Sequence, residues 1–325
     1  MTKGNHVIVT GGAGYIGSHV CKALAGHGYI PVTYDNLQGG HLWAIKWGPF
    51  IQNDIHNTEA LCSAFREYNP IAVFHLASSI NVRESLLDPA KYYHNNVSGS
   101  LSLLKAMTEC RVPNLVFSST ASIFGNPQYI PIDEKHQKAP LHAYGKSKYM
   151  VELMLEDFQR SHGLCSAALR YFNAAGADSS TEIGEAHDPE THLIPLVIQT
   201  ALKRRAALDI YGTSYNTEDG TAIRDYIHVA DLAEAHIKAL EWLIQNKQSI
   251  GVNLGTGQGY SIRKVIETVE LISGKKVASN HCPPSPDAAC LVADPSLAFQ
   301  LLKWTPKFSS LSHIVESALN WHSKR

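Results

Sequence analysis

The chain has 325 residues, of which 44% are hydrophobic and 18% are charged. This composition excludes a disordered chain, and the length predicts roughly two domains or one large α/β unit with an appendage. Lys and Arg together number 28 and Asp and Glu together number 29, so the formal net charge is -1. That balance excludes a bulk positive field, so we expect neither nucleic acid nor a membrane as a partner.

The cysteines and the N-terminus indicate the compartment. Six cysteines lie far apart with no CxxC pair, which excludes a disulfide scaffold and the spacing of zinc ribbons or thioredoxins. The first residues lead directly into an apolar run with no signal-peptide pattern. No stretch approaches the roughly 18 apolar residues of a membrane span. We therefore expect a soluble, cytoplasmic chain.

Apolar, β-branched runs alternate with helical patterns from residue 6 to residue 171. The runs predict strands at 6–10, 29–34, 50–52, 72–76, 115–118 and 165–171. Helical spacing extends from the glycine-rich turn to about residue 25, and recurs at 58–68, 92–110 and 144–162. Strands that are apolar throughout indicate burial on both faces of a parallel sheet. The predicted fold class is α/β, with a Rossmann-type doubly wound parallel sheet.

The pattern changes after about residue 174. A loop rich in Gly, Asp, Ser and Glu is expected at 174–192, and turns are expected around 211–225 and 282–286. Between and after them lie patterns typical of helices at 194–204, 230–245 and 261–273, with one strand at 251–255. We expect a Rossmann domain over 1–173 and a smaller C-terminal α/β lobe over 174–325, with some chain returning to the main sheet.

A glycine-rich turn joins the first strand to the first helix. Gly11, Gly12, Gly14 and Gly17 satisfy both the GxGxxG and the GxxGxxG spacing. Glycines are needed there because backbone N–H groups approach a pyrophosphate closely and the helix lies tight against the strand. The helix N-terminus adds partial positive charge. The turn therefore predicts a dinucleotide site.

An acidic residue at the end of the second strand indicates which dinucleotide is bound. Asp35 lies about 20 residues after the glycines, where a carboxylate accepts hydrogen bonds from a ribose. Asn36 follows it, and residues 36–41 contain no Arg or Lys to hold a 2′-phosphate. NAD is favoured over NADP.

A tyrosine and a lysine at helical spacing suggest a general base. Tyr144 and Lys148 are four residues apart and share one helix face. A phenol has an ordinary pKa near 10. A neighbouring ammonium group and an oxidised nicotinamide would lower it. The pair follows a dinucleotide-binding turn in the sequence and lies about 25 residues after Ser118-Ser119-Thr120. In this context it is a candidate catalytic site.

The motifs together resemble a known family. They are TGGAGYIG at 10–17, Ser118-Ser119-Thr120, YGKSK at 144–148, RYFN at 170–173, GEAHDPETHLIP at 184–195 and DGTAIRDYIHVADLA at 219–233. They are similar to the extended short-chain dehydrogenases/reductases and, among these, to the UDP-glucose 4-epimerases. The similarity extends from about Val7 to Trp304.

The resemblance implies a role for each matching residue. Tyr144 would be the base that removes the sugar O4 proton, Lys148 would tune it, and Thr120 would hydrogen-bond O4. The NAD cleft would be lined by the glycine turn and by Tyr15, Ile16, Asp35, Asn36, Asp54, Ile55, Leu76, Ala77, Asn96, Ser118 and Tyr171. The UDP-sugar would be held by Asn173, His192, Leu193, Tyr211, Arg224, Asp287 and Leu291.

The implied reaction is a transient oxidation at C4. Tyr144 takes the O4 proton while hydride passes to NAD, and the hydride then returns to the other face of the 4-keto sugar.

The resemblance also implies a homodimer formed through helices near 91–110 and 144–162. Dehydratases of this superfamily carry an acid directly after the Thr, whereas this chain has Ala121-Ser122. A dehydratase is therefore disfavoured.

Two departures from the family pattern concern phosphate binding. Residues 283–286 are Pro-Pro-Ser-Pro where relatives offer an arginine for the pyrophosphate. Arg83 stands where the family often has glycine, and it is either a substitute phosphate ligand or a surface charge.

The sugar itself stays open between several alternatives. Leu291 replaces a bulky tyrosine of some epimerases, so an N-acetylated hexose such as UDP-N-acetylglucosamine is one alternative substrate. UDP-xylose or UDP-arabinose is another. A non-catalytic NAD-binding sensor on the same fold is the rival class.

The segment from His187 to His192 offers two imidazoles and two carboxylates, but Pro189 interrupts a helix face, so no metal site is predicted.

Overall fold

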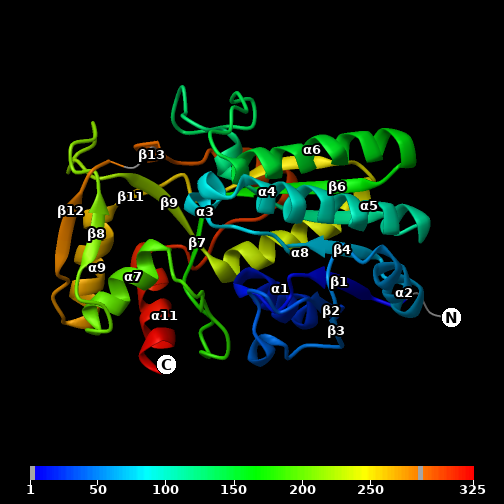
Figure 1. The fold of residues 1–325 in the computed structure, drawn as a ribbon, viewed down its shortest axis with the longest axis horizontal. Coiled ribbons are helices and arrows are strands. Elements are labelled where there is room, and N and C mark those ends of the chain that lie inside the picture. The colour runs from blue at the N-terminus through cyan, green and yellow to red at the C-terminus, as the bar shows by residue number, and fades with distance from the viewer. Residues whose placement is uncertain (1–3, 285–287) are drawn as a thin grey trace.

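The computed structural model describes residues 4–284 and 288–325, and its largest element is a seven-stranded parallel sheet (Figure 1). The strands lie in the order β10-β6-β5-β4-β1-β2-β3, and every neighbouring pair is parallel. Their bounds are β1 His6–Thr10, β2 Ile30–Asp35, β3 Phe50–Gln52, β4 Ala72–His75, β5 Asn114–Thr120, β6 Cys165–Tyr171 and β10 Ile250–Leu254. The predicted doubly wound α/β fold is confirmed.

Helices cover both faces of this sheet, which explains why its strands are apolar throughout. One face packs against α1 (Tyr15–Gly26), α8 (Val229–Asn246) and α10 (Ser296–Leu302). The other packs against α2 (Thr58–Tyr68), α5 (Gly99–Glu109) and α6 (Ala143–His162). In Figure 1, α5 and α6 run side by side along the upper part of the molecule. Over the described ranges, none of the helices is long and apolar enough to cross a membrane.

The helix expected at 92–110 begins earlier in the structure and contains a π-helical segment. The chain forms α3 (Val82–Leu87), α4 (Pro89–Tyr92) and a π-helical segment at Tyr93–Ser98 before α5 begins. Asp88 caps α4 by accepting a hydrogen bond from the backbone N–H of Lys91, and Pro89 occupies the first helical turn. These start signals place the first helical turn ahead of the position that hydrophobic spacing indicated.

A smaller lobe lies at one end of the sheet, on the left in Figure 1. It contains the helices α7 (Leu193–Ala201), α9 (Ile262–Ser273) and α11 (Leu311–Ser323), which share an apolar core with β8. Its strands are β7 Asn173–Ala175, β8 Leu208–Tyr211, β9 Ile223–His228, β11 Gly259–Ser261, β12 Ser279–Cys282 and β13 Cys290–Leu291. β7, β11 and β13 pair with β9, and β8 pairs with β12.

The chain returns to the main sheet after entering the smaller lobe. β10 pairs with β6, with Val252 opposite Leu169, and α8 and α10 pack on the sheet beside it. The carboxyl ends of β1, β4, β5 and β6 therefore open toward the segments that build the smaller lobe. In α/β sheets, ligands bind at this edge.

Candidate active site

The glycine turn at the end of β1 allows three backbone segments to approach closely. Gly11 has a φ of +76°, and a Cβ added there would lie 2.6 Å from the backbone nitrogen of Ala77 after β4. A Cβ on Gly17 would lie 2.1 Å from the carbonyl oxygen of Gly11. Helix α1 begins behind Gly14, which has no side chain to cap the first N–H groups. This cradle fits the pyrophosphate of a dinucleotide.

Asp35 lies at the end of β2 beside this cradle. It is 8% exposed, and its two carboxylate oxygens accept backbone hydrogen bonds from Ala13 at 3.0 Å and Leu37 at 2.8 Å. Burial raises the pKa of the carboxyl, and these two N–H groups oppose the rise. The carboxylate is thus held in place at the position where a ribose would lie.

A cavity of about 1070 Å³ extends from the glycine turn to the carboxyl ends of β5 and β6. Most of the predicted cofactor residues line it together with some of the predicted sugar residues. Those that do are Gly11, Gly14, Tyr15, Ile16, Gly17, Asp35, Asn36, Ile55, Leu76, Ala77, Ser118, Thr120, Tyr144, Tyr171, Asn173 and His192. The structure therefore gathers these residues around one space.

Four predicted cofactor residues are not part of that lining. Gly12 lies beneath the turn, and Lys148 is 2% exposed. Asp54 accepts hydrogen bonds from the amide of Asn36 at 2.7 Å and the backbone N–H of His56 at 2.9 Å. Asn96 is 2% exposed, with its neighbour Asn95 on the cavity wall instead. Gly12, Lys148 and Asn96 therefore lie behind the wall, and Asp54 contacts it through Asn36.

The predicted catalytic residues meet where β5 ends and α6 begins. Thr120 is the last residue of β5, and Tyr144 lies in the first turn of α6, which His142 caps through the backbone N–H of Gly145. Burial raises the pKa of the Tyr144 phenol, and a hydrogen bond with the Thr120 hydroxyl lowers it. In the free site the phenol therefore keeps its proton.

Lys148 lies one turn along α6 from Tyr144. Its ammonium group donates to the carbonyl oxygen of Ser118 at 2.9 Å, and burial lowers its pKa to about 7. The effect of this ammonium group on Tyr144 stays a prediction. The hydroxyls of Ser118 and Tyr171 hydrogen-bond each other beside it.

Two buried networks hold α6 in place, one against the sheet and one against the π-helical segment at Tyr93–Ser98. Glu152 of α6 accepts from Arg170 of β6 at 2.9 and 2.8 Å and from the Ser119 hydroxyl at 2.6 Å. On the other side, the Asn96 amide donates to Ser147 at 3.0 Å, and Ser147 donates to the carbonyl oxygen of Tyr144 at 2.8 Å. Sequence reasoning missed both networks, because each joins residues that are far apart in the chain.

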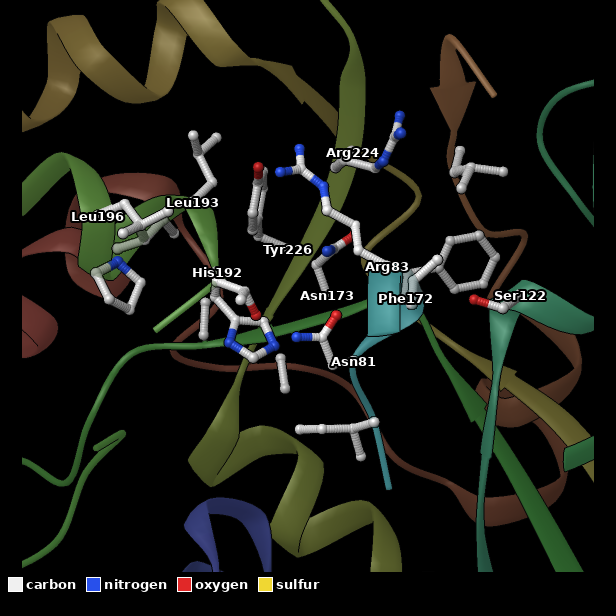
Figure 2. A pocket seen from close by; sticks show the side chains of 18 of the residues that line it. Asn81, Arg83, Ser122, Phe172, Asn173, His192, Leu193, Leu196, Arg224 and Tyr226 are labelled. Atoms are coloured by element: carbon white, nitrogen blue, oxygen red, sulfur yellow. The ribbon is translucent and has the colours of Figure 1, made fainter. Parts of the chain in front are cut away.

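A second cavity, of about 470 Å³, continues into the smaller lobe and shares its wall with the first. The predicted sugar-binding residues on it are Thr120, Asn173, His192, Leu193, Tyr211, Arg224 and Leu291. Of the other two, Tyr144 lines only the first cavity, and Asp287 lies outside the described residues. Sequence reasoning missed Asn81, Ser122, Phe172, Leu196 and Tyr226, which also line this pocket and appear in Figure 2.

Three arginines line this second cavity, and one of them, Arg205, pairs with Asp209 at 3.1 Å, which leaves Arg83 and Arg224. Arg224 donates to the carbonyl oxygens of Ile223 at 2.8 Å and Ala289 at 3.4 Å. Arg83, from α3, places its guanidinium carbon 4.0 Å from the ring centroid of Tyr211. Figure 2 shows Arg83 reaching past Asn173 and Tyr226 toward the interior of the pocket. Among the described residues, neither arginine has a carboxylate within ion-pair distance.

Four side chains for which no metal site was predicted come together where the two cavities meet. The Nδ1 atom of His192 lies 2.7 Å from Glu185 and 2.9 Å from Glu190, and that of His187 lies 3.1 Å from Glu185. Burial opposes a charge on His192, but the charge of Glu185 outweighs it and raises the pKa of the imidazole. The turn at Pro189 folds these side chains toward one another without needing a helix face.

Comparison with known proteins places this geometry in a family. Residues 7–255 match the model of the NAD dependent epimerase/dehydratase family. The chain is 45% identical over 324 residues to a UDP-glucose 4-epimerase of Rhizobium meliloti, covering 99% of this chain and 98% of the relative. It is 46% identical over 317 residues to one of Azospirillum brasilense, covering 97% and 91%.

Solved structures agree with this result. The crystal structure of UDP-glucose 4-epimerase from Brucella ovis in complex with NAD superposes with a TM-score of 0.96 at 46% identity, covering 98% of each chain. The crystal structure of UDP-glucose-4-epimerase from Stenotrophomonas maltophila, with bound NAD and formylated UDP-arabinopyranose, superposes with a TM-score of 0.95 at 37% identity, covering 98% of each chain. The resemblance seen in the sequence motifs is confirmed, and this chain belongs to the NAD-dependent epimerase/dehydratase family.

Proposed function

We propose that the protein is an NAD-dependent UDP-glucose 4-epimerase that interconverts UDP-glucose and UDP-galactose. The observation that carries the proposal is the position of Tyr144. Its phenol lines the cavity that begins at the glycine turn, beside Thr120, which belongs to both cavities. A base placed there reaches a sugar and a nicotinamide at once. Relatives of 39% to 46% identity over nearly the whole chain carry the same name.

NAD fits the first cavity through the residues that this chain supplies. The glycine turn leaves room for the pyrophosphate, and Asp35 offers its carboxylate to the ribose. When bound, NAD supplies the acceptor for hydride from C4 of the sugar and the donor that returns it. We assign Tyr15, Ile16, Ile55, Leu76 and Ala77 to the walls around it.

Tyr144 exchanges a proton with O4 of the sugar, and Thr120 assists it through a hydrogen bond. Burial keeps the free phenol protonated, so its anion has to be favoured by groups near it. Thr120 supplies a hydrogen bond, and Lys148 supplies a charge at the next turn of α6. Tyr144 then takes the O4 proton as C4 is oxidised and gives it back as C4 is reduced from the other face.

The second cavity anchors the nucleotide. Inversion at C4 requires the sugar to present both faces, so binding energy has to come from the UDP portion. We assign Arg224 to the diphosphate, since a guanidinium group matches phosphate oxygens in a bidentate manner. Tyr211, Leu193 and His192 line the same cavity, where the uridine would bind.

Arg83 is the second guanidinium group that we assign to the diphosphate. It lines both cavities, and its contact with Tyr211 spans from α3 to the smaller lobe. Two arginines without a carboxylate partner on one pocket wall favour a ligand with two negative charges. This assignment favours a phosphate ligand over a surface charge at Arg83, and it compensates for the prolines at 283 and 284.

Leu291 supports a second candidate substrate, a UDP-N-acetylhexosamine. It lines the second cavity and packs with Phe172 against a small apolar cluster of Ile123, Phe124 and Ile132. A leucine leaves more room there than a tyrosine. A UDP-Glc/GlcNAc 4-epimerase from Campylobacter jejuni is 34% identical to this chain.

We also propose that two copies pair through α5 and α6. These helices lie side by side on one face of the molecule. Met150 and Leu153 of α6 are each 42% exposed. Their burial against a second copy would remove apolar surface from water.

The Tyr144→Phe variant tests the proposed reaction. We expect kcat for UDP-galactose to fall about 10²–10⁴-fold, because the proton acceptor is lost, while bound NAD remains after purification. Tyr149→Phe, on the same helix, is the matched control and should keep wild-type turnover. If the wild type turns over no UDP-sugar although it holds NAD, the sensor interpretation is favoured instead.

The Leu291→Tyr variant tests the size of the sugar pocket. We expect turnover of UDP-N-acetylgalactosamine to fall about tenfold or more, with UDP-galactose changed far less, because a larger side chain fills the space for the acetamido group. Initial rates with both substrates measure the ratio. A wild type that does not bind UDP-N-acetylgalactosamine would contradict this second candidate.

The Arg83→Gln variant tests the second phosphate ligand. We expect the Kd for UDP to rise about fivefold to tenfold and the Kd for uridine to stay the same, since only the former has a diphosphate. Calorimetry measures both. Arg66→Gln, an exposed arginine paired with Glu109, is the control. Equal behaviour of the two variants would identify Arg83 as a surface charge.

The Met150→Glu/Leu153→Glu variant tests the pairing of two copies. We expect the wild type to sediment with twice the chain mass of 35.6 kDa and this variant to sediment as a single chain, because charges replace the apolar contact. Leu271→Glu, at a residue 83% exposed on α9, is the control and should leave the mass unchanged. A wild type at the single-chain mass would refute the dimer.

A further inference from the structure

A compact group of two imidazoles and two carboxylates lies in the segment that leads into α7. One donor atom from each of Glu185, His187, Glu190 and His192 lies within 4.8 Å of all the others. Glu185 is 3% exposed, and the side chain of Glu190 is 6% exposed. Two carboxylates are therefore held together at a site largely removed from water.

Both imidazoles of this group face one oxygen of Glu185, and one oxygen of Glu190 also accepts from the backbone N–H groups of Thr191 and His192 at 2.8 and 2.9 Å. The single Nδ1 atom of His192 faces Glu185 at 2.7 Å and Glu190 at 2.9 Å, although one N–H can point at only one oxygen with good geometry. His187 directs its own Nδ1 atom at the same oxygen of Glu185 at 3.1 Å. The second oxygen of Glu190 is 4.0 Å from that nitrogen. Both imidazoles thus converge on the space between the carboxylates.

That space has the dimensions and the donors of a metal site. Zinc binds imidazole nitrogen and carboxylate oxygen at about 2.0–2.2 Å in a tetrahedron, which places neighbouring donors about 3.3 Å apart. The four imidazole–carboxylate separations given above range from 2.7 to 4.0 Å, and all four donor atoms lie within 4.8 Å of one another. We propose that Glu185, His187, Glu190 and His192 bind one divalent transition-metal ion, with zinc as the best match to two nitrogen and two oxygen donors.

The surrounding structure holds this segment in place and leaves a path for an ion. The carbonyl oxygen of Glu185 accepts from the indole of Trp321 in α11 at 2.8 Å, and that of Ala186 accepts from His41 at 2.7 Å. Ala177 and Gly184 form an isolated bridge just before it. His187 lines the first cavity, and His192 lines both. Figure 2 shows His192 at the wall of the second.

The bound ion has a structural role at the junction of the two cavities. It neutralises the two buried carboxylates and ties the loop that follows Gly184 to the start of α7, where Leu193 and His192 line the pocket. It lies in the wall, so the proton and hydride steps at C4 proceed without it. The proposed metal site therefore does not depend on the epimerase assignment.

One other group of donors has to be controlled for. Cys62, Glu109 and Cys110 also place their donor atoms within 4.8 Å, and their thiols would compete for zinc. The experiment therefore uses untagged protein with its NAD, both as wild type and as the Cys62→Ser/Cys110→Ser variant. After treatment with a chelator, each is dialysed against equimolar Zn²⁺ or Co²⁺ and its metal content is measured by mass spectrometry.

We expect one ion per chain in the wild type and in the Cys62→Ser/Cys110→Ser variant. In that background, His187→Gln/His192→Gln should lose the ion, while His281→Gln, at an exposed histidine on β12, should keep it. Bound Co²⁺ should give visible bands of a tetrahedral nitrogen and oxygen site, without thiolate charge-transfer absorption. Zn²⁺ should also raise the Tm of the background variant, by mass action, and leave that of His187→Gln/His192→Gln unchanged.

Two results would overturn the proposal. One is a Cys62→Ser/Cys110→Ser protein that binds no ion at equimolar Zn²⁺ or Co²⁺. The other is an ion that persists when both histidines are replaced. Circular dichroism and NAD content show whether His187→Gln/His192→Gln is folded. If it is not, Glu190→Gln is the second variant, and it should weaken Co²⁺ binding and alter the visible bands.

Discussion

The close approach of the glycine turn to its neighbours is the constraint on which the site depends. Gly11 lies against the backbone at Ala77, and Gly17 lies against the carbonyl of Gly11, so that α1 starts at the carboxyl edge of the sheet. A side chain at either position would separate the helix from β1 and β4. Because parallel strands end at one edge, Asp35, Thr120 and Tyr171 line the same cavity as this turn.

The position of Tyr144 rests on a second constraint, the attachment of α6 to the sheet. Glu152 and Arg170 form a pair in which each side chain is less than a tenth exposed, and the Ser119 hydroxyl joins it. Removal of one partner from such a pair costs about 3–5 kcal/mol, because the other charge stays buried. On the opposite side, Asn96 and Ser147 hold the first turn of the helix. Buried polar contacts therefore set the geometry of the base.

Charged side chains of opposite sign line the second cavity. Arg83 and Arg224 leave positive charge without a carboxylate partner among the described residues, which suits a diphosphate. Glu185 and Glu190 carry negative charge, which is balanced by protonated histidine or, as we propose, by a metal ion. Both arrangements are consistent with the near-zero net charge, since the fields act over a few ångströms.

Local patterns in the sequence determined the six N-terminal strands of the sheet, the glycine turn, and the spacing of Tyr144 and Lys148. These depend on periodicity and on neighbours in the chain, and Asp35 and Thr120 could be located from them as candidate residues. Tertiary structure alone decided that the returning strand, β10, pairs with β6, that Asn96 supports α6 from behind the cavity wall, and that Arg83 reaches Tyr211. It also placed the Nδ1 atoms of His187 and His192 beside the same carboxylate, that of Glu185. Such contacts join residues that no helical or strand period relates, so only the folded chain reveals them.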